Sequence, residues 1–355
     1  MKPKKILLFS LSLKKGGAEN QLSKLAIFLQ NTTEFDVSVV YFVKGNDFEE
    51  VFQKNDIMYT YFNVKQVSQL FSLIKYCRKL KPSLIISFMF GANLIARFIK
   101  ILCGIPIITS VRNNEISGLY KILYKLTYKL DNATTFNSQY ALEKFIKEKL
   151  TKKQSSYLVN NAITVKENEY VTKNNQVFTL ISLAHFRPQK DYKTLFQAIK
   201  LLKNDNVSVK LFVLGHLYKQ EWPFELIKEL GIEEEVEIVG FTLDTQKYLN
   251  QSDALVLSSW WEGTPNAILE GMAHYLPIIA SDIPGSHELV TNAKCGELFE
   301  VKNENDLKDK IIKMINFPKD YKKELGNNGY NYVIEHFEET MVYKQWLNII
   351  NSNIK

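Results

Sequence analysis

The chain contains few cysteines, and their spacing excludes the sites that cysteines usually build. Three occur among the 355 residues, at Cys77, Cys103 and Cys295. They lie far apart along the chain and suit neither a metal site nor a disulfide framework. We therefore expect a reducing, cytoplasmic setting for the protein.

The chain also lacks a long hydrophobic run. Residues 1–5, three of which are lysines, are followed by an apolar stretch of only about eight residues with no small-residue cleavage site, which is not a secretory signal. The apolar stretch 84–96 is too short to span a bilayer, and Arg97 and Lys100 follow it at once. The sequence predicts a cytoplasmic protein that is soluble or peripheral at the inner face of the membrane.

Histidine is absent from the first half of the chain, where acidic residues are also scarce. All five histidines lie in the second half, beginning at His185. Residues 1–165 contain 24 Lys and Arg against 11 Asp and Glu, a net charge of +13, whereas residues 166–355 have a net charge of −6. The asymmetry suggests two domains, the first attracted to an anionic membrane face or a phosphorylated acceptor. Lysine-rich helices that only keep the protein soluble are the alternative.

Apolar runs alternate with amphipathic segments along the whole chain. Continuous apolar strands between helices are typical of parallel sheets that are covered on both faces. We expect an α/β protein with two doubly wound, Rossmann-like domains that face each other across a cleft. The predicted strands are 5–11, 37–43, 84–88, 105–109 and 133–136 in the first half, and 177–183, 207–214, 236–239, 254–257 and 277–280 in the second.

The expected domains are residues 1–165 and residues 177–337. The polar segment 166–176 has no apolar periodicity and is the expected linker. Residues 304–355 predict helices without strands, and the last of these, ~338–355, is expected to pack back on the first domain. Its apolar stripe consists of Trp346, Leu347, Ile349 and Ile350.

The segment 253–290 predicts strand, polar turn, helix, strand and helix, and it carries Glu262 and Glu270 with seven residues between them. Thr264 is a suitable N-cap and Pro265 suits the first helical position. The positive end of such a helix favours an anion such as phosphate. A carboxylate beside an anion is favourable when it accepts hydrogen bonds from neutral groups such as sugar hydroxyls. Exposed surface acids, or the carboxylate pair of a glycoside hydrolase, are the alternatives.

Three more features lie at predicted strand ends. Gly16 and Gly17 would let backbone N–H groups approach a phosphate, or they form a plain tight turn. Arg187 and Lys190 would hold a diphosphate together, or they are solvated cations. Phe241 would contact a nucleobase, or it belongs to the core. The first loop is neither GxGxxG nor a P-loop, which disfavours a nicotinamide cofactor.

Residues 119–130 predict an amphipathic helix with a cationic ridge. Lys121, Lys125 and Lys129 follow one another at four-residue spacing, and apolar side chains are offset from them. Such a helix suits contact with an anionic membrane surface. A solvated helix on the side of a helical layer is the alternative.

Together these loops resemble those of glycosyltransferase family 4, the retaining, nucleotide-sugar-dependent enzymes of GT-B fold. The strongest match is SWWEGTPNAILEGMA at residues 259–273, which contains the family's E-x7-E signature as Glu262 and Glu270. KGGAE at 15–19 and RPQKD at 187–191 match at the other two loops. The resemblance covers essentially the whole chain and is most specific over 177–290.

The resemblance implies a role for each matching residue. Glu262, Arg187 and Lys190 would be catalytic, with Arg187 and Lys190 on the diphosphate and Glu262 on the donor sugar. Glu270 would bind the ribose. The second domain would bind the nucleotide sugar and the first the acceptor. Further donor contacts would come from Gly16, Gly17, Phe241, Gly263, Thr264, Asn266 and Ala267.

Two positions depart from the family pattern. His185 stands where many relatives carry arginine, and Arg187 is expected to substitute for it. Arg112 and Asn113 stand at a strand end where many relatives carry a histidine near the donor sugar. We treat both as candidate contacts to the donor sugar or the acceptor.

The implied activity is sugar transfer from a nucleotide-diphosphate sugar to a glycan or lipid-linked acceptor in surface polysaccharide or lipopolysaccharide synthesis. A UDP-sugar is preferred as donor and a GDP-sugar is the second choice. No metal is expected, since the chain lacks a DxD motif. A GT-B-like sugar-nucleotide epimerase and a non-catalytic basic binding module are the alternatives. No stacking-aromatic or helix-turn-helix pattern supports binding of nucleic acid.

Overall fold

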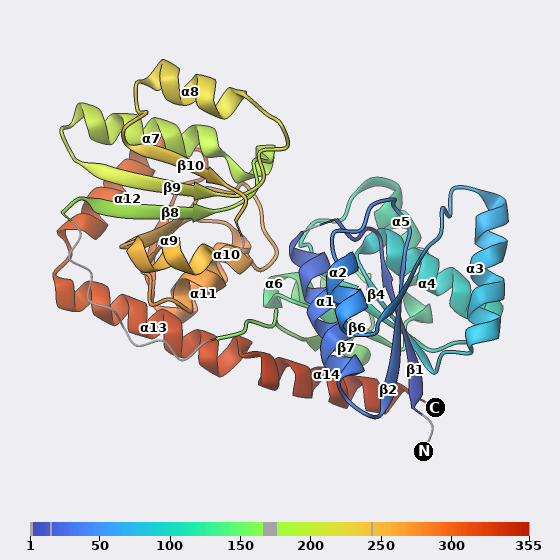
Figure 1. The fold of residues 1–355 in the computed structure, drawn as a ribbon. Helices are drawn as coiled ribbons and strands as arrows, with labels where there is room; N and C mark the ends of the chain where they lie inside the picture. Colours follow the sequence, from blue (N-terminus) through green and yellow to red (C-terminus); the bar gives the residue numbers. More distant parts are fainter. Residues whose placement is uncertain (1–2, 15, 166–175, 243, 355) are drawn as a thin grey trace. The chain divides into compact units, whose positions relative to one another are not determined.

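The computed structural model describes residues 3–14, 16–165, 176–242 and 244–354 (Figure 1). The chain forms two compact units, one comprising Met1–Ala162 and Glu339–Lys355 and the other comprising Ile163–Glu338. Each unit contains one parallel sheet covered by helices. The predicted α/β class with two doubly wound domains is confirmed. The linker expected at 166–176 lies outside the described residues except for Gln176.

The first unit is built on a seven-stranded sheet in the order β3-β2-β1-β4-β5-β6-β7, with every neighbouring pair parallel. The strand order changes direction between β1 and β4. In a doubly wound sheet this is the position at which ligands bind beyond the carboxyl ends of the strands. The strands are β1 (Lys4–Ser10), β2 (Phe35–Tyr41), β3 (Met58–Tyr61), β4 (Leu84–Phe88), β5 (Ile107–Val111), β6 (Ala133–Phe136) and β7 (Ser156–Leu158).

Helices cover both faces of this sheet because successive strand residues point to opposite sides. Ile6 and Leu8 of β1 pack in one cluster with α1 and α2, whereas Leu7 and Phe9 pack in another with α3 and α4. Helices α5 and α6 share a third cluster around Tyr124. The helices are α1 (Gly17–Gln30), α2 (Glu49–Lys54), α3 (Val67–Leu80), α4 (Phe90–Cys103), α5 (Gly118–Thr127) and α6 (Gln139–Lys147).

The last helix, α14 (Glu339–Asn353), belongs to the first unit and not to the second (Figure 1). Trp346 and Ile350 are buried in the same cluster as the β1 side chains Ile6 and Leu8. The Trp346 ring stacks on Phe88 with 5.9 Å between the ring centroids. The predicted packing of the C-terminal helix on the first domain is therefore confirmed.

The first unit contains a fully buried ion pair between Arg97 of α4 and Asp131. Each side chain is 1% exposed. Arg97 donates from Nε to Oδ1 (2.9 Å) and from Nη2 to Oδ2 (2.6 Å), so the contact is bidentate. Thr109 donates a further hydrogen bond to Asp131 Oδ2 (2.8 Å), and Tyr124 places its ring 4.0 Å from the guanidinium carbon. The pair joins α4 to strands β5 and β6.

The second unit contains a six-stranded parallel sheet in the order β10-β9-β8-β11-β12-β13, with its change of direction between β8 and β11. Its strands are β8 (Phe178–Leu183), β9 (Val209–Leu214), β10 (Val236–Gly240), β11 (Ala254–Leu257), β12 (Ile278–Ser281) and β13 (Gly296–Phe299). Its helices are α7 (Tyr192–Asn204), α8 (Trp222–Leu230), α9 (Thr245–Gln251), α10 (Asn266–Met272), α11 (Pro284–Ala293), α12 (Glu304–Asn316) and α13 (Lys319–Phe337).

Three strands were not predicted: β3, β7 and β13. All three lie at the edge of a sheet, and most of their residues are exposed or partly exposed. Without cover on both sides they carry no continuous apolar run, which is the pattern that predicted the others. In the described part of the chain, no helix combines the length and the hydropathy needed to cross a membrane.

Candidate active site

The change of strand order in the second unit brings two candidate loops together. One loop follows β8 and carries Arg187 and Lys190, and the other follows β11 and carries Glu262. Strands β8 and β11 are hydrogen-bonded neighbours, so both loops leave the sheet at the same edge. This is the ligand-binding position of a doubly wound sheet.

Backbone and hydroxyl hydrogen bonds hold the two loops against each other. Ser258 Oγ donates to the Lys190 carbonyl (2.8 Å), and the Trp260 N–H donates to the Gln189 carbonyl (2.8 Å). Ser281, at the end of β12, donates to the Ser259 carbonyl (2.6 Å). These contacts fix the backbone from which Lys190 and Glu262 extend.

Lys190 and Glu262 form an ion pair at this edge. Lys190 Nζ contacts Glu262 Oε1, and Ser259 Oγ donates to the same oxygen (2.8 Å). The side chains are 19% and 17% exposed. A cation held in a partly desolvated position by a carboxylate is suited to bind an anion and a polar group side by side.

Two glycines allow neighbouring backbone segments to pack closely against the loops after β11 and β8. A Cβ on Gly285, near the start of α11, would lie 1.9 Å from the Gly263 carbonyl oxygen. A Cβ on Gly215, which follows β9, would lie 2.1 Å from the Ala184 carbonyl oxygen. Both positions therefore require glycine, because a backbone carbonyl cannot yield to a methyl group.

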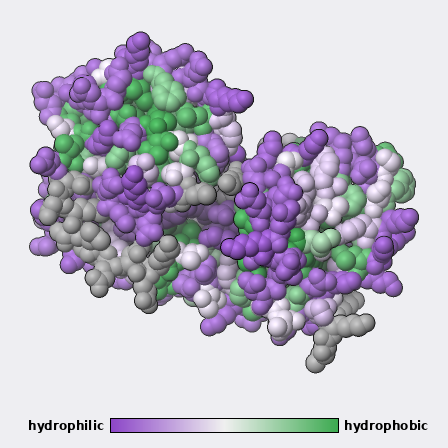
Figure 2. Space-filling view, viewed as in Figure 1, coloured by the Kyte–Doolittle hydropathy of each residue, from purple (hydrophilic) through white to green (hydrophobic). Residues whose placement is uncertain are grey.

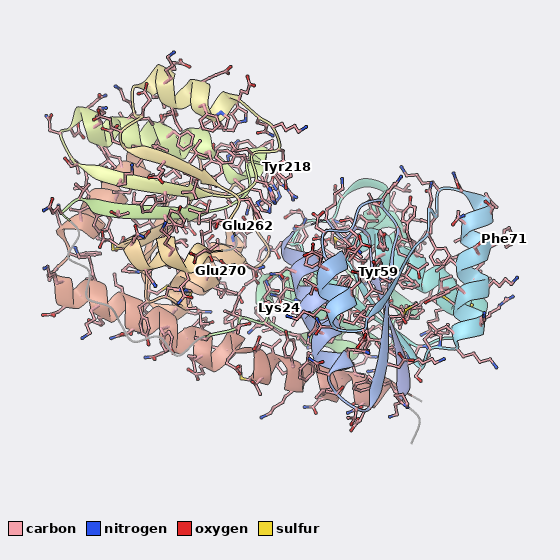
Figure 3. The ribbon with its side chains drawn as sticks, in the orientation of Figure 1. Lys24, Tyr59, Phe71, Tyr218, Glu262 and Glu270 are labelled. Carbon is pink, nitrogen blue, oxygen red and sulfur yellow. The ribbon has the colours of Figure 1, made fainter. Side chains whose placement is uncertain are left out.

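Glu270 lies in α10, one turn beyond the loop that carries Glu262 (Figure 3). The helix begins at Asn266, and its N-cap is Pro265, with φ −72° and ψ 110°. The expectation that Thr264 is the N-cap and Pro265 the first helical residue is therefore wrong by one position. Proline has no N–H to donate and its ring fixes φ, so it is compatible with the extended N-cap as well as with the first turn. Gly263, Thr264, Asn266 and Ala267 are all partly exposed here.

An aromatic cluster adjoins the loop after β8. The Phe241 ring stacks on His216 with 4.1 Å between centroids and is 41% exposed, so it is not a core residue. Arg187 donates from Nη2 to Tyr218 Oη (3.1 Å), whereas Lys190 pairs with Glu262. The two cations thus have different partners. His216 and Tyr218 were not predicted, although the glycine directly after strand β9 was a signal for a close approach.

His185 is held as a neutral imidazole between these groups. The backbone N–H of His216 donates to His185 Nδ1 (3.1 Å). The neutral His185 ring therefore carries its proton on Nε2. Burial lowers the pKa of His185 to about 4, and the charges of His216, Arg187 and Lys190 act in the same direction. A neutral donor therefore occupies the position at which, by the resemblance to glycosyltransferase family 4, many relatives carry arginine.

The stability of the second unit is expected to depend on pH through His185. An unfolded histidine titrates near pH ~6.5. Between that pH and ~4 the unfolded chain binds a proton that the folded chain does not, so the free energy of unfolding falls as the pH falls. The free energy of unfolding of the wild type should fall between pH ~7 and ~5, and we expect His185→Gln to make this fall smaller by about 1–2 kcal/mol. Urea unfolding at the two pH values measures the difference. His336→Gln is the control, and equal pH slopes for wild type and His185→Gln would contradict the expectation.

The candidates of the first unit lie at the carboxyl ends of β1 and β5. Gly16 is the N-cap of α1, and Gly17 is the first residue of that helix. A Cβ on Gly16 would lie 2.5 Å from the Glu19 carboxylate, which accepts a hydrogen bond from Ser12 Oγ (2.7 Å). Gly16 thus makes room for an acidic side chain over the loop. Lys15 lies outside the described residues.

Arg112 and Asn113 follow β5. Arg112 donates to Ser110 Oγ (2.8 Å) and to Asn161 Oδ1 (3.0 Å), and its guanidinium carbon lies 4.8 Å from the Phe88 ring centroid. Burial lowers the pKa of Arg112 to about 9. No carboxylate of the residues that the structure describes forms an ion pair with it, so its charge is available to an anionic ligand. Asn113 accepts a hydrogen bond from the Glu115 N–H (3.1 Å) in a turn.

Metal-ligating side chains do not gather in the described ranges. Within them, no group of three or more His, Cys, Asp or Glu residues is placed to hold a metal ion. Three charged side chains of the second unit extend from the loops at the edge where β8 and β11 end: Arg187, Lys190 and Glu262.

The second unit is similar to known proteins. Residues 166–332 match the family model of glycosyl transferases group 1. The chain is 28% identical over 211 residues to the N-acetylgalactosamine-N,N'-diacetylbacillosaminyl-diphospho-undecaprenol 4-alpha-N-acetylgalactosaminyltransferase of Campylobacter jejuni, over 58% of this chain and 56% of that protein. It is 24% identical over 277 residues to the UDP-Gal:alpha-D-GlcNAc-diphosphoundecaprenol alpha-1,3-galactosyltransferase of Escherichia coli, over 71% of each.

The whole chain also matches a solved structure. It superposes on Anabaena HepE in complex with UDP and glucose with a TM-score of 0.83 at 19% identity, over 98% of this chain and 100% of that chain. The match covers 62% and 34% of the length of two other curated relatives, and 56% of the Campylobacter jejuni protein. The chain therefore spans only about a third to three fifths of the length of these relatives. Residues 166–332 therefore match the group 1 glycosyl transferases, and the chain as a whole has the GT-B fold.

Proposed function

We propose that the protein is a retaining glycosyltransferase. It moves a sugar from a nucleotide-diphosphate sugar to a glycan or lipid-linked acceptor in surface polysaccharide synthesis. A UDP-sugar is the preferred donor and a GDP-sugar the second choice. The observation that carries the proposal is the Lys190–Glu262 pair at the change of strand order, within the residues that match the glycosyl transferase family model.

The donor's diphosphate would bind to the loop after β8. Glycosyl transfer builds negative charge on the leaving diphosphate and positive charge at the anomeric carbon. Lys190 and Arg187 are fixed cations that favour departure of the leaving group, and neutral His185 adds a hydrogen-bond donor. With two cations on the phosphates, the reaction needs no bound metal.

The sugar and the nucleoside would bind to the loop after β11 and to α10. Glu262 contacts the donor sugar beside the diphosphate, and Glu270 accepts hydrogen bonds from the ribose hydroxyls. Phe241 on His216 offers a flat, partly exposed surface on which a nucleobase can stack. Gly263, Thr264, Asn266 and Ala267 supply further donor contacts.

The acceptor would bind to the first unit. Arg112, directly after β5, offers a cation without a carboxylate partner among the described residues. The names of the Campylobacter jejuni and Escherichia coli relatives specify lipid diphosphate acceptors. An acceptor with a phosphate group is consistent with this cation and with the +13 charge of residues 1–165.

A ligand screen tests the proposal. Nucleoside diphosphates and their sugars should raise the melting temperature of the protein, with uridine compounds strongest. Glu270→Ala should weaken donor binding about 10- to 100-fold, since a hydrogen bond to a charged group contributes about 1.5–3 kcal/mol. Calorimetry measures the change, and Glu229→Ala on the exposed side of α8 is the control. Unchanged affinity in Glu270→Ala would refute its role, and turnover of the sugar nucleotide without acceptor would favour an epimerase.

A further inference from the structure

Helix α5 turns its apolar side away from the core of the first unit. Leu119, Ile122 and Leu126 fall on one face of the helix and are 68%, 59% and 75% exposed. Tyr124, on the opposite side, is completely buried and anchors the helix. A surface helix of a soluble protein normally shows the reverse arrangement.

The neighbouring helices extend this exposed apolar surface. Helix α4 contacts both α3 and α5. Ile101 of α4 is 63% exposed and Phe98 is 40% exposed, and they lie one turn apart. Phe71 at the start of α3 is 67% exposed (Figure 3), and Figure 2 shows apolar surface at this edge of the unit. Large aliphatic and aromatic side chains exposed on adjacent helices mark an interaction surface.

The same helices are strongly basic. Residues 67–130 contain ten Lys and Arg and one acid, Glu115, which pairs with Lys144 outside this range. Two of these cations pair with acids outside the range, the buried Arg97 with Asp131 and Lys121 with Glu148. Helices α3, α4 and α5 contain no Asp or Glu at all. Lys125 and Lys129 are exposed beside the apolar stripe of α5, and within the described residues neither forms an ion pair. The partner of this surface must therefore offer both apolar groups and negative charge.

We propose that α3, α4 and α5 form a face that binds the surface of an anionic lipid bilayer. The apolar side chains enter the boundary between headgroups and acyl chains, and the lysines reach the lipid phosphates. A second copy of the chain docked through the same face would set lysines against lysines. A nucleic acid would leave the aliphatic side chains in water. The membrane role goes beyond the transfer reaction and does not depend on it.

Flotation of the full chain with lipid vesicles tests the proposal. Wild type should float with an equal mixture of phosphatidylcholine and phosphatidylglycerol at low salt, and less at high salt. Lys125→Gln with Lys129→Gln should lower the partition coefficient about 30-fold, since each lysine near an anionic surface contributes about a fivefold change. Ile122→Gln with Leu126→Gln should lower it about tenfold or more.

Phe224→Gln, which removes a 51% exposed side chain from α8 in the second unit, is the matched control and should bind as wild type does. Circular dichroism confirms that each variant is folded. Flotation of both double variants at the wild-type level would overturn the proposal. It would also be overturned by equal binding to pure phosphatidylcholine, by self-association that the Ile122 and Leu126 changes abolish, or by salt-sensitive DNA binding without flotation. None of these results bears on the binding of nucleotide sugars.

Discussion

Replacing Lys190 by glutamine is expected to lower kcat/KM for sugar transfer about 100- to 1000-fold, an effect of about 2–4 kcal/mol on the transition state. The Lys190 ammonium group is fixed by Glu262 and by the hydrogen bond from Ser258 to the Lys190 carbonyl. In the proposed reaction it is therefore preorganised toward the charge that develops on the departing diphosphate. Glutamine keeps the length and polarity of the side chain but removes the charge.

The measurement is nucleoside diphosphate release from the donor that the ligand screen identifies, with calorimetry of the diphosphate as a readout that needs no acceptor. The dissociation constant should rise about 10- to 100-fold, as for loss of a hydrogen bond to a charged group. Lys193→Gln removes the same charge from an exposed position three residues away and should change neither quantity. If the two variants behave alike, Lys190 does not bind the diphosphate.

Replacing Asp131 by alanine is expected to destabilise the first unit by about 3–5 kcal/mol. Arg97 is 1% exposed and loses both hydrogen bonds to the carboxylate, so an uncompensated cation remains in the interior. Thr109 loses its acceptor as well. For a unit of this size the melting temperature of its transition should fall on the order of 10 °C.

Scanning calorimetry measures the effect, and a donor ligand that stabilises the second unit separates the two transitions. Asp205→Ala is the control, because its ion pair with Lys308 lies at the surface, with side chains 48% and 21% exposed, and should contribute less than about 1 kcal/mol. The double variant Arg97→Met with Asp131→Leu should recover much of the loss, since no buried charge is left unpaired. A loss in Asp131→Ala no larger than in Asp205→Ala would contradict this account of the buried pair.

The sequence predicted the central strands of both sheets and the edge strand β10, but it missed the other three edge strands. Strands covered on both faces, such as β4 and β11, have continuous apolar runs and appear with the predicted bounds. Most residues of the edge strands β3, β7 and β13 are exposed or partly exposed, so these strands carry no continuous apolar run. Helix α10 begins one residue later than predicted, because proline is compatible with either side of a helix start.

The contacts of the candidate site were predictable where a loop carries its own sequence motif. Glu262 and Lys190 belong to such loops, and the structure joins them. His216 and Tyr218 lie on the loop after β9, which has no recognisable motif. Their approach to His185 and Arg187 depends on the pairing of β8 with β9 and on the close contact at Gly215. Contacts of this kind arise from tertiary structure and leave little trace in a local pattern.

The placement of α14 has a consequence for how the protein is made. Ile163–Glu338 is continuous in sequence, so the second unit can acquire its structure as soon as the ribosome has released that stretch. The first unit leaves synthesis earlier but still lacks Trp346 and Ile350, which fill its interior beside Phe88. The unit that is translated first is therefore the unit that completes its folding last. Its hydrophobic core stays incomplete while the second unit is synthesised and folds.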